Sequence, residues 1–267
     1  MKSNPIFAGV DIGSTTSKAV LIDSNEDILG FAIIDTQHDR NASGEAVFQS
    51  VLKAAGKTKE DISCVYSTGY GRKAFKYSDR AFPEIICHAH GTVNLYPDVR
   101  TIIDIGGQDS KIISLDAAGI ASKFEMNDKC AAGTGRFFEV LSNRLLNVPL
   151  DELGMLALKS KNPCQISSTC TVFAESEIVS YLSQGILIED VAMGVLESIA
   201  RRVWAMGSQT RMPFNPAIVV TGGLARNVAL KRALKEKFKK EIETIENPQL
   251  PAALGAALIA KNEYAGS

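Results

Sequence analysis

A short phrase that occurs twice constrains the fold of this chain more than any other feature of its sequence. Val10-Asp11-Ile12-Gly13 opens the first copy, and Ile103-Asp104-Ile105-Gly106 opens the second. In each copy a Lys follows the Asp by seven residues, at Lys18 and at Lys111. An apolar strand leads into the Asp, and a second apolar strand follows a turn that contains glycine, which is typical of a β-hairpin. We therefore expect two hairpins of one design.

The residues of this hairpin suit a phosphate group. Glycine lets backbone N–H groups approach an anion, Ser14, Thr15 and Thr16 add hydroxyl donors, and the Lys adds a positive charge. The Asp at the strand end is placed to hold Mg²⁺ through water, because that ion keeps much of its hydration shell. A plain turn would explain one copy, but two matched copies favour a clamp on one polyphosphate. Neither copy fits the phosphate-loop or the dinucleotide-binding pattern, so a nucleotide site of another architecture is predicted.

The composition excludes several classes of partner. Hydrophobic residues make up 45% of the 267 residues, which is enough for one large or two modest domains. Lys and Arg number 29 against 30 Asp and Glu, so no basic excess favours nucleic acid or an anionic membrane. No apolar run reaches the length of a spanning helix and no signal stretch follows Met1, so we expect a cytoplasmic protein. Five scattered cysteines suit a reducing compartment better than a disulfide framework.

Strand-like apolar runs alternate with helical stretches along the whole chain, and no Pro/Gly-rich linker interrupts them. This alternation predicts an α/β fold. Because the hairpin occurs twice, we expect two related halves that face each other across a cleft. The expected domains are 1–95, joined by the C-terminal helix 251–267, and 96–250. Four helices are expected. One ends at Gly56, one contains Phe137, Leu141 and Leu145, one lies around 196–206, and one covers the small residues 251–258.

A third motif extends the pattern. Val219-Val220-Thr221-Gly222-Gly223 is an apolar strand that ends in two glycines, and a Gly- and Ala-rich helix closes the chain. With the two hairpins, these segments resemble the motifs of the acetate kinase, sugar kinase, heat-shock chaperone and actin superfamily. The resemblance covers essentially the whole chain and implies an actin-like ATPase fold, in which two ribonuclease-H-like domains bind ATP and Mg²⁺ between them. It implies a first phosphate motif of Asp11, Gly13, Ser14, Thr15, Thr16 and Lys18, and a second of Asp104, Gly106, Gly107, Gln108 and Asp109. It implies an adenosine motif of Gly222, Gly223 and Asn227. Asp11 and Asp104 would contact Mg²⁺ through water.

Two cysteines lie in segments that set this chain apart from the kinases. Cys130 lies in the segment 127–137, which reads Asn-Asp-Lys-Cys-Ala-Ala-Gly-Thr-Gly-Arg-Phe, and Cys170 lies in the Ser/Thr-rich start of the segment 167–177. Each stands at or just before an expected helix start, where unpaired N–H groups and the helix dipole lower the pKa of a thiol. A buried Cys that packs as a small hydrophobe is the alternative for either one. The pair favours metal ligation.

Both segments closely resemble the activators of 2-hydroxyacyl-CoA dehydratases and the ATP-binding subunits of benzoyl-CoA reductases, the BadF/BadG family. In that family the two Cys positions bind iron–sulfur. The resemblance therefore implies Cys130 and Cys170 as ligands, with Gly133, Thr134 and Gly135 as further cofactor-binding residues. A 4Fe–4S cluster takes four thiolates and one chain offers two, so a homodimer that shares one cluster completes the set.

The other cysteines are weaker candidates. Cys164 precedes Cys170 by only six residues, but it lies beside a proline and outside the motif. Cys64 and Cys87 are expected to be structural. The run Cys87-His88-Ala89-His90 could suggest a metal site, yet no second group of ligands at zinc spacing accompanies it, so a packed helix is favoured.

The resemblance implies an ATPase that is coupled to electron transfer. ATP binding and hydrolysis would rotate the domains and the helices at the cluster, so that one low-potential electron passes to a partner iron–sulfur enzyme such as a 2-hydroxyacyl-CoA dehydratase. Ferredoxin or flavodoxin is the expected electron donor. We expect Gln108 to orient the attacking water, with Asp109 as the second choice.

Several alternatives stay open at this point. The acceptor could be a double-cubane-cluster protein, or the chain could be the ATP-binding subunit of a benzoyl-CoA reductase. A small-molecule kinase would share the ATP site, but the stretch 30–95 offers Asp35, Asp39 and Glu84 without a recognisable sugar motif. A scaffold or chaperone of the actin or heat-shock type would not need paired cysteines.

Overall fold

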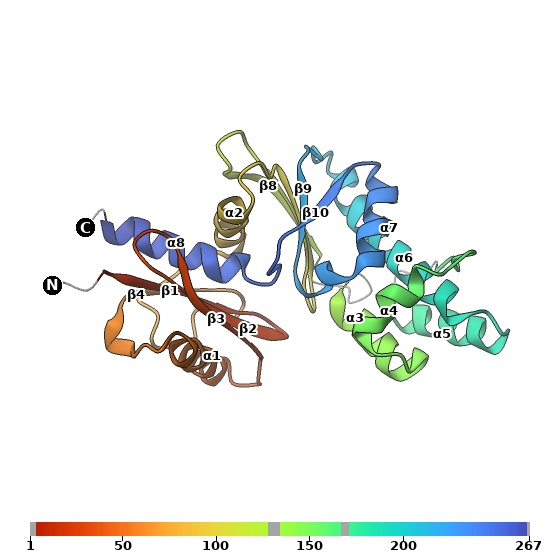
Figure 1. Ribbon diagram of the computed structural model, residues 1–267. Helices are drawn as coiled ribbons and strands as arrows, with labels where there is room; N and C mark the ends of the chain where they lie inside the picture. Colours follow the sequence, from red (N-terminus) through yellow and green to blue (C-terminus); the bar gives the residue numbers. More distant parts are fainter. Residues whose placement is uncertain (1–3, 128–133, 167–170, 266–267) are drawn as a thin grey trace. The chain divides into compact units, whose positions relative to one another are not determined.

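The computed structural model describes residues 4–127, 134–166 and 171–265 of the chain (Figure 1). The chain divides into two units, each built around its own five-stranded sheet. Unit 1 comprises Met1–Asp98, Leu115–Ala121 and Gln249–Ser267, and unit 2 comprises Val99–Ser114 and Ser122–Pro248. The domain boundaries expected from the sequence remain a prediction.

The sheet of unit 1 has the strand order β3-β2-β1-β4-β5. The pairs β3–β2 and β2–β1 are antiparallel, whereas the pairs β1–β4 and β4–β5 are parallel. The central strand β1 is buried over its whole length because apolar clusters form on both of its faces, around Phe7 on one and around Ala8 on the other. The strands are β1 (Ile6–Ile12), β2 (Thr16–Ile22), β3 (Ile28–Asp35), β4 (Ile62–Thr68) and β5 (Arg80–Ala81).

Helices form the two apolar clusters with this sheet. Phe48 of α1 packs in the cluster that contains Ala8, and apolar residues of α8 pack in the cluster that contains Phe7. Helix α1 begins after Asp39, whose side chain accepts hydrogen bonds from two backbone N–H groups of the first turn. It ends at Gly56, which has a φ of 61°, as the sequence predicted. The helices are α1 (Arg40–Ala55), the 3₁₀ turn η1 (Lys59–Asp61), α2 (Glu84–Leu95) and α8 (Pro251–Ala265).

Helix α8 approaches its neighbours so closely that backbone touches backbone. A Cβ built on Gly9 of β1 would lie 1.9 Å from the carbonyl oxygen of Ala253. A Cβ built on Gly255 of α8 would lie 1.7 Å from the carbonyl oxygen of Cys87 in α2. Only glycine fits at these two contacts. The close approach explains why α8 consists largely of small residues.

Unit 2 repeats the strand pattern of unit 1. Its sheet has the order β10-β9-β6-β7-β8, in which β6 is antiparallel to β7 and parallel to β9. The pair β6–β7 therefore corresponds to β1–β2, and β9 corresponds to β4. The edge strand β8 was not expected from the sequence, because its exposed and half-buried residues form no apolar run. The strands are β6 (Thr101–Ile105), β7 (Ser110–Leu115), β8 (Ala121–Asn127), β9 (Ile218–Thr221) and β10 (Ile242–Thr244).

The helices of unit 2 pack on one face of its sheet in the largest core cluster. This cluster joins Ile105 of β6 and Val220 of β9 to apolar residues of α6, among them Leu196 and Val203. The helix expected through Phe137 begins as α3 and continues as the π-helix η3. The helices are α3 (Gly135–Val140), η3 (Leu141–Leu146), α4 (Leu150–Ala157), α5 (Thr171–Ser183), α6 (Ile188–Gln209), the 3₁₀ turn η4 (Gly223–Arg226) and α7 (Val228–Phe238).

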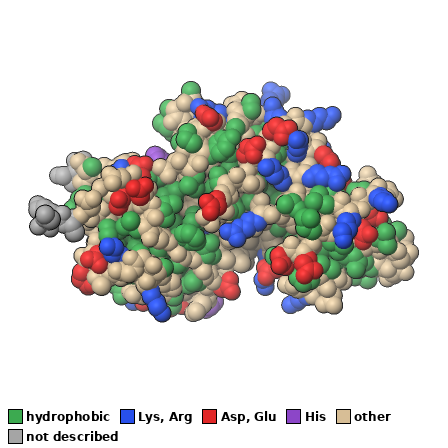
Figure 2. Space-filling model, in the orientation of Figure 1, with side chains coloured by type: hydrophobic (Ala, Val, Ile, Leu, Met, Phe, Trp, Pro, Cys, Tyr) green, Lys and Arg blue, Asp and Glu red, His purple; other side chains and the backbone are tan. Residues whose placement is uncertain are grey.

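Two features of the exterior bear on partners. Among the residues that the structure describes, no helix combines the length and the apolar character needed to cross a membrane. On the face drawn in Figure 2, acidic and basic side chains are interspersed and do not separate by sign. This mixing accompanies the near balance of 29 basic and 30 acidic residues in the sequence.

We expect Gly255→Ala to lower the free energy of unfolding by about 3 kcal/mol, because the added methyl group must push α8 away from the α2 backbone. Urea unfolding followed by circular dichroism measures the loss. Asn262→Ala, an exposed position of the same helix, is the control and should change the free energy by less than about 0.5 kcal/mol. Equal unfolding midpoints for Gly255→Ala and the parent chain would contradict this packing.

Candidate functional site

The Asp and the Lys of each repeated phrase lie opposite each other across a hairpin. Asp11 of β1 is the register partner of Lys18 in β2, and Asp104 of β6 is the register partner of Lys111 in β7. The seven-residue spacing in the sequence is the spacing that this register requires. Lys18 Nζ lies 3.3 Å from an Asp11 carboxylate oxygen, and Lys111 Nζ lies 3.2 Å from one of Asp104. Each Lys is therefore held by its own Asp.

In the first hairpin the turn itself requires Gly13. The Gly13 N–H donates to the carbonyl oxygen of Thr16 over 3.2 Å, and a Cβ on Gly13 would lie 2.7 Å from that oxygen. The Arg40 guanidinium donates to the carbonyl oxygens of Gly13 and Ser14, each over 3.3 Å. In the described part of the chain, no hydrogen bond uses the backbone N–H of Ser14 or Thr15. The turn thus engages its carbonyls and keeps two backbone donors for another acceptor.

Thr15 adds a second unusual feature to this turn. Its hydroxyl oxygen is buried and makes no hydrogen bond, and no other buried side-chain polar atom among the described residues is in that state. A buried polar group without a partner costs about 1–3 kcal/mol, so such groups are rare unless they serve a purpose. The neighbouring Ser17 hydroxyl, by contrast, is paired with the Thr36 hydroxyl over 2.8 Å. The Thr15 hydroxyl is suited to an acceptor that enters the turn.

The second hairpin holds a buried cluster of three charged side chains. The Lys111 side chain is 2% exposed, and its Nζ lies 3.2 Å from Asp104 and 2.6 Å from Asp109. The Thr221 hydroxyl donates to the other Asp104 oxygen over 3.1 Å. Two carboxylates therefore share the Lys111 ammonium group, whereas the Lys18 ammonium group contacts the carboxylate of Asp11.

The turn of the second hairpin repeats the first turn and adds a contact with a helix. Within the described residues, no hydrogen bond uses the backbone N–H of Gly107 or Gln108. The carbonyl oxygens of Gly106 and Gly107 accept hydrogen bonds from the N–H groups of Gly135 and Arg136, over 2.8 and 2.9 Å. The structure thus brings the second phosphate motif against the first residues of α3.

Gly222 directly follows β9 and lies beside the second hairpin. Its φ is 89°, and a Cβ there would lie 2.2 Å from the carbonyl oxygen of Ile105, so both the backbone and the space require glycine. Gly223 begins η4, which leads to Asn227. The Asn227 side chain accepts hydrogen bonds from two N–H groups of α7 and is the N-cap of that helix. The structure therefore joins the adenosine motif to the second phosphate motif and uses Asn227 as a helix cap.

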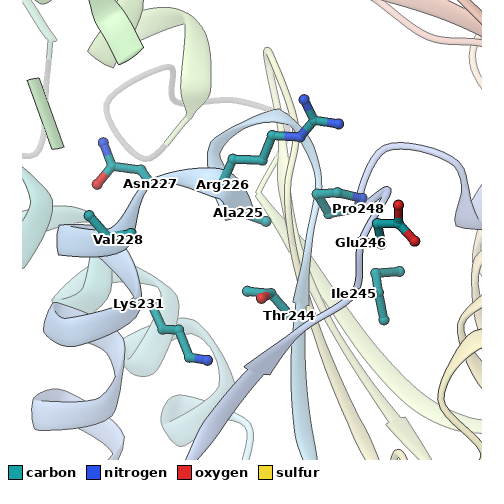
Figure 3. A pocket seen from close by; sticks show the side chains of 9 residues that line it. All are labelled: Ala225, Arg226, Asn227, Val228, Lys231, Thr244, Ile245, Glu246 and Pro248. Carbon is teal, nitrogen blue, oxygen red and sulfur yellow. The ribbon is translucent and has the colours of Figure 1, made fainter. Parts of the chain in front are cut away.

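A cavity of about 390 Å³ lies beside this turn in unit 2 (Figure 3). It lies between η4 and the start of α7 on one side and the end of β10 with the chain after it on the other. Its lining combines apolar surface, such as Val228 and Pro248, with charged groups, such as Arg226 and Lys231. This mixture suits a flat apolar ring with polar edges. The sequence predicted only Asn227 of its nine residues, because the lining comes from two stretches, 225–231 and 244–248, that no shared motif connects.

Cys130, Cys170 and Gly133 lie outside the described residues. A described helix follows each cysteine: α5 begins at Thr171, directly after Cys170, whereas α3 begins at Gly135, five residues after Cys130. Both cysteines therefore precede a helix within a few residues.

The thiols of the three described cysteines have raised pKa values. Burial raises the pKa of Cys87 to about 12 and the pKa of Cys64 to about 11, and burial together with the carboxylate of Asp190 raises the pKa of Cys164. A raised pKa keeps the thiol protonated, whereas metals bind the thiolate. Across the described chain, including the Cys87-His88-Ala89-His90 run of α2, no group of three or more His, Cys, Asp or Glu could hold a metal ion.

The segment before Cys170 is fixed along helix α6. An Asp190 oxygen accepts hydrogen bonds from the Ser160 hydroxyl and from the next two backbone N–H groups, over 2.6, 3.1 and 3.0 Å. These bonds, that of Ser160 first, lower the pKa of Asp190. Farther along α6, Arg201 donates to the carbonyl oxygen of Ile166 over 3.0 Å. The chain is thus anchored up to Ile166.

Sequence comparison relates the whole chain to one family. The pattern of the BadF/BadG/BcrA/BcrD ATPase family matches residues 8–260. The activator of lactoyl-CoA dehydratase from Anaerotignum propionicum is 45% identical over 253 residues, which cover 94% of this chain and 96% of that protein. The 2-hydroxyisocaproyl-CoA dehydratase activator from Clostridioides difficile is 43% identical over 255 residues, 96% of this chain and 94% of that protein. A benzoyl-CoA reductase subunit from Thauera aromatica is 30% identical over 262 residues, 95% of this chain and 92% of that protein.

Solved structures agree with the sequence comparison. Component A of (R)-2-hydroxyglutaryl-CoA dehydratase from Acidaminococcus fermentans has a TM-score of 0.92 and 39% identity, covering 98% of this chain and 99% of that one. The Clostridium difficile activator with bound ADPNP has a TM-score of 0.92 and 42% identity, covering 98% and 96%. A ROK family glucokinase from Streptomyces griseus has a TM-score of 0.56 at 14% identity, covers 96% and 99%, and shares the fold alone. The expected actin-like ATPase fold and the resemblance to dehydratase activators are confirmed.

We expect Asp190→Asn to lower the free energy of unfolding by about 2 kcal/mol at neutral pH, because three hydrogen bonds to a charged acceptor are weakened. The pKa of Asp190 is lowered from 3.8 in the folded state, so ionised Asp190 stabilises the fold. This contribution is fully present above the unfolded-state pKa and is lost as the pH falls through the folded-state pKa. Urea unfolding at about pH 7 and about pH 3 measures the difference from the parent chain. The control is Asp98→Asn, which changes an exposed acid. A difference between Asp190→Asn and the parent chain that persists undiminished at the lower pH would contradict this role of the Asp190 carboxylate.

Proposed function

Because the chain belongs to the BadF/BadG/BcrA/BcrD ATPase family, we propose that it is an ATP-dependent activator that passes a low-potential electron to a partner iron–sulfur enzyme, such as a 2-hydroxyacyl-CoA dehydratase. The observation that carries this proposal is the pair of matched Asp–Lys hairpins in a chain that superposes on two such activators at a TM-score of 0.92. ATP hydrolysis is the reaction that these hairpins would serve.

The turns of the two hairpins supply the phosphate contacts in this proposal. Support comes from the backbone N–H groups of Ser14, Thr15, Gly107 and Gln108, none of which is used by another hydrogen bond of the described chain. The buried Thr15 hydroxyl would gain the partner that it lacks. Gly13 and Gly106 close the turns with their own N–H groups, so their role is to shape the turn and not to contact phosphate directly.

Asp11 and Asp104 would hold Mg²⁺ through water. One oxygen of each carboxylate already contacts a Lys, at 3.3 Å and 3.2 Å, so contact through the hydration shell fits these residues better than direct ligation. The ion would neutralise phosphate charge, and the Lys would keep each carboxylate fixed.

The cavity of Figure 3 is the proposed place of the nucleoside. It adjoins the Gly222 turn, whose backbone approaches both the Ile105 carbonyl and the Asp104 carboxylate. A phosphate chain on the second hairpin would therefore lead to the cavity by way of this turn.

Gln108 is the proposed residue that orients the attacking water. Its side chain is exposed at the tip of the second hairpin, where no strand pairing restrains it. The carboxylate of Asp109 is buried and lies 2.6 Å from Lys111, which makes it less available as a base. Asp109 therefore remains the second choice.

Cys130 and Cys170 are the proposed ligands of a 4Fe–4S cluster shared by a homodimer. The support for them is that both precede a helix start by a few residues, whereas burial raises the pKa of each of the other three cysteines. A bound cluster would supply a single low-potential electron. The anchored segment before Cys170 and the helix starts after both cysteines would position the ligands. Ferredoxin or flavodoxin is the proposed donor of the electron, and the cytoplasm is the proposed location.

A role as an ATP-binding component of a benzoyl-CoA reductase is the second candidate function. The 30% identity to the Thauera aromatica protein favours it over a double-cubane-cluster partner, for which no observation speaks. The dehydratase activators are preferred because their identities, 43% and 45%, are higher. The likeness to a glucokinase rests on fold alone and does not support a small-molecule kinase.

We expect Val228→Trp to weaken ADP binding by about tenfold or more, because the indole would fill the cavity, whereas Val228 is 47% exposed and contributes little to the core. Isothermal titration calorimetry with ADP measures the change. Glu236→Trp, an exposed position two turns along α7, should bind ADP like the parent chain. Equal affinities in the two variants would place the nucleoside elsewhere.

Cys130→Ala and Cys170→Ala should each abolish the visible absorption of anaerobically reconstituted protein and its ability to activate a 2-hydroxyacyl-CoA dehydratase, while ADP binding persists. The reason is that removal of one ligand per chain leaves two of four thiolates. Cys64→Ala and Cys164→Ala are matched controls and should keep both the colour and the activation. Colour that survives in Cys130→Ala would refute the ligand set.

A further inference from the structure

The start of helix α3 is capped by the turn of the second hairpin and not by its own N-cap residue. The first N–H groups of a helix have no acceptor within the helix and are commonly satisfied by an N-cap side chain. Thr134 is the N-cap of α3, and its side chain makes no capping hydrogen bond. The acceptors are instead the carbonyl oxygens of Gly106 and Gly107, which bind the N–H groups of Gly135 and Arg136 over 2.8 and 2.9 Å.

This contact is close and leads into a well-anchored helix. A Cβ on Gly135 would lie 3.2 Å from the Gly106 oxygen, so the helix start fits directly against the turn. From there α3 and η3 run without a break from Gly135 to Leu146, and Phe138 and Leu141 are buried in the core of unit 2. A displacement of the turn therefore acts on the end of the helix that is joined to the segment 128–134.

The two carbonyl groups that cap α3 share their peptide planes with two of the proposed phosphate donors. The Gly106 carbonyl and the Gly107 N–H belong to one peptide unit, and the Gly107 carbonyl and the Gln108 N–H belong to the next. A peptide unit is rigid and planar, so its N–H and C=O rotate together and point in opposite directions. An acceptor on the N–H side also polarises the carbonyl and strengthens the hydrogen bond that the carbonyl accepts.

We propose that the peptide units Gly106–Gly107 and Gly107–Gln108 are the link through which the bound phosphates set the position and stability of α3. Phosphate oxygens on the N–H side hold the two planes in the orientation that caps the helix. Loss of the terminal phosphate frees the planes and weakens the cap. The start of α3, the helix that follows Cys130 in the sequence, then shifts within unit 2. This inference rests on the proposed function for the roles of the nucleotide and of Cys130.

Hydrogen exchange tests the link in the full-length protein. Peptic fragments that cover 134–146 are followed in the presence of saturating ADP and of saturating ADPNP. We expect exchange at the start of α3 to be slower by about fivefold with ADPNP, the equivalent of one net hydrogen bond. Equal exchange with the two nucleotides in the parent chain would overturn the inference. Failure of the parent chain to bind either nucleotide would instead overturn the proposed function.

Two substitutions at one residue separate the backbone contact from the side chain. Arg136→Pro removes the N–H that binds the Gly107 carbonyl, and proline is tolerated in the first turn of a helix. Arg136→Ala keeps that N–H and removes the same exposed side chain, with its ion pair to Glu139. We expect Arg136→Ala to retain the nucleotide dependence of exchange and Arg136→Pro to reduce it to less than about twofold.

The outcomes of this comparison are distinct. Nucleotide dependence that survives in Arg136→Pro would overturn the inference, and so would its loss in Arg136→Ala. Should Arg136→Pro fail to fold, the comparison of ADP with ADPNP in the parent chain and in Arg136→Ala still decides the matter.

Discussion

The cross-strand pair of an Asp and a Lys is the interaction on which the site depends. A pair of this kind lies in each hairpin one register position before the last strand pair at the turn, at Asp11–Lys18 and at Asp104–Lys111. Burying such charges adds little net stability, because desolvation offsets most of the attraction, but losing one partner costs about 3–5 kcal/mol. The pair therefore fixes register and turn geometry more than it stabilises the fold. The backbone N–H groups that the hairpin does not use for its own hydrogen bonds lie in the turn.

The two turns share their donors and differ in what holds their carbonyl oxygens. In unit 1 the guanidinium of Arg40, the first residue of α1, binds the carbonyls of the turn. In unit 2 the N–H groups at the start of α3 bind them. A positive group thus meets the carbonyl side of each turn, as expected for oxygens that carry partial negative charge. The two hairpins therefore differ in role. A side chain, that of Arg40, holds the first turn, whereas the second turn is bonded to a helix that follows a cysteine in the sequence.

The sequence predicted those features whose signal is local or repeated. The hairpins, the helix stop at Gly56 and the close-packed C-terminal helix follow from neighbouring residues, and the structure contains each of them. Features that depend on distant contacts escaped prediction: Arg40 reaches the first turn across 27 residues, and Gly135 meets the second turn from far along the chain. Asn227, expected in the adenosine motif, lines the cavity, and its role as the N-cap of α7 was not predicted. The cavity escaped because its walls come from separate segments, and only the fold brings them together.

The central claim is that the chain uses nucleotide turnover to move an electron from a cluster held by two copies of itself. Native mass spectrometry of anaerobically prepared protein tests this most directly. The account predicts a dimer that carries about four irons and four sulfides in total and that binds ADP. An iron-free monomer that hydrolyses ATP at an undiminished rate would contradict it.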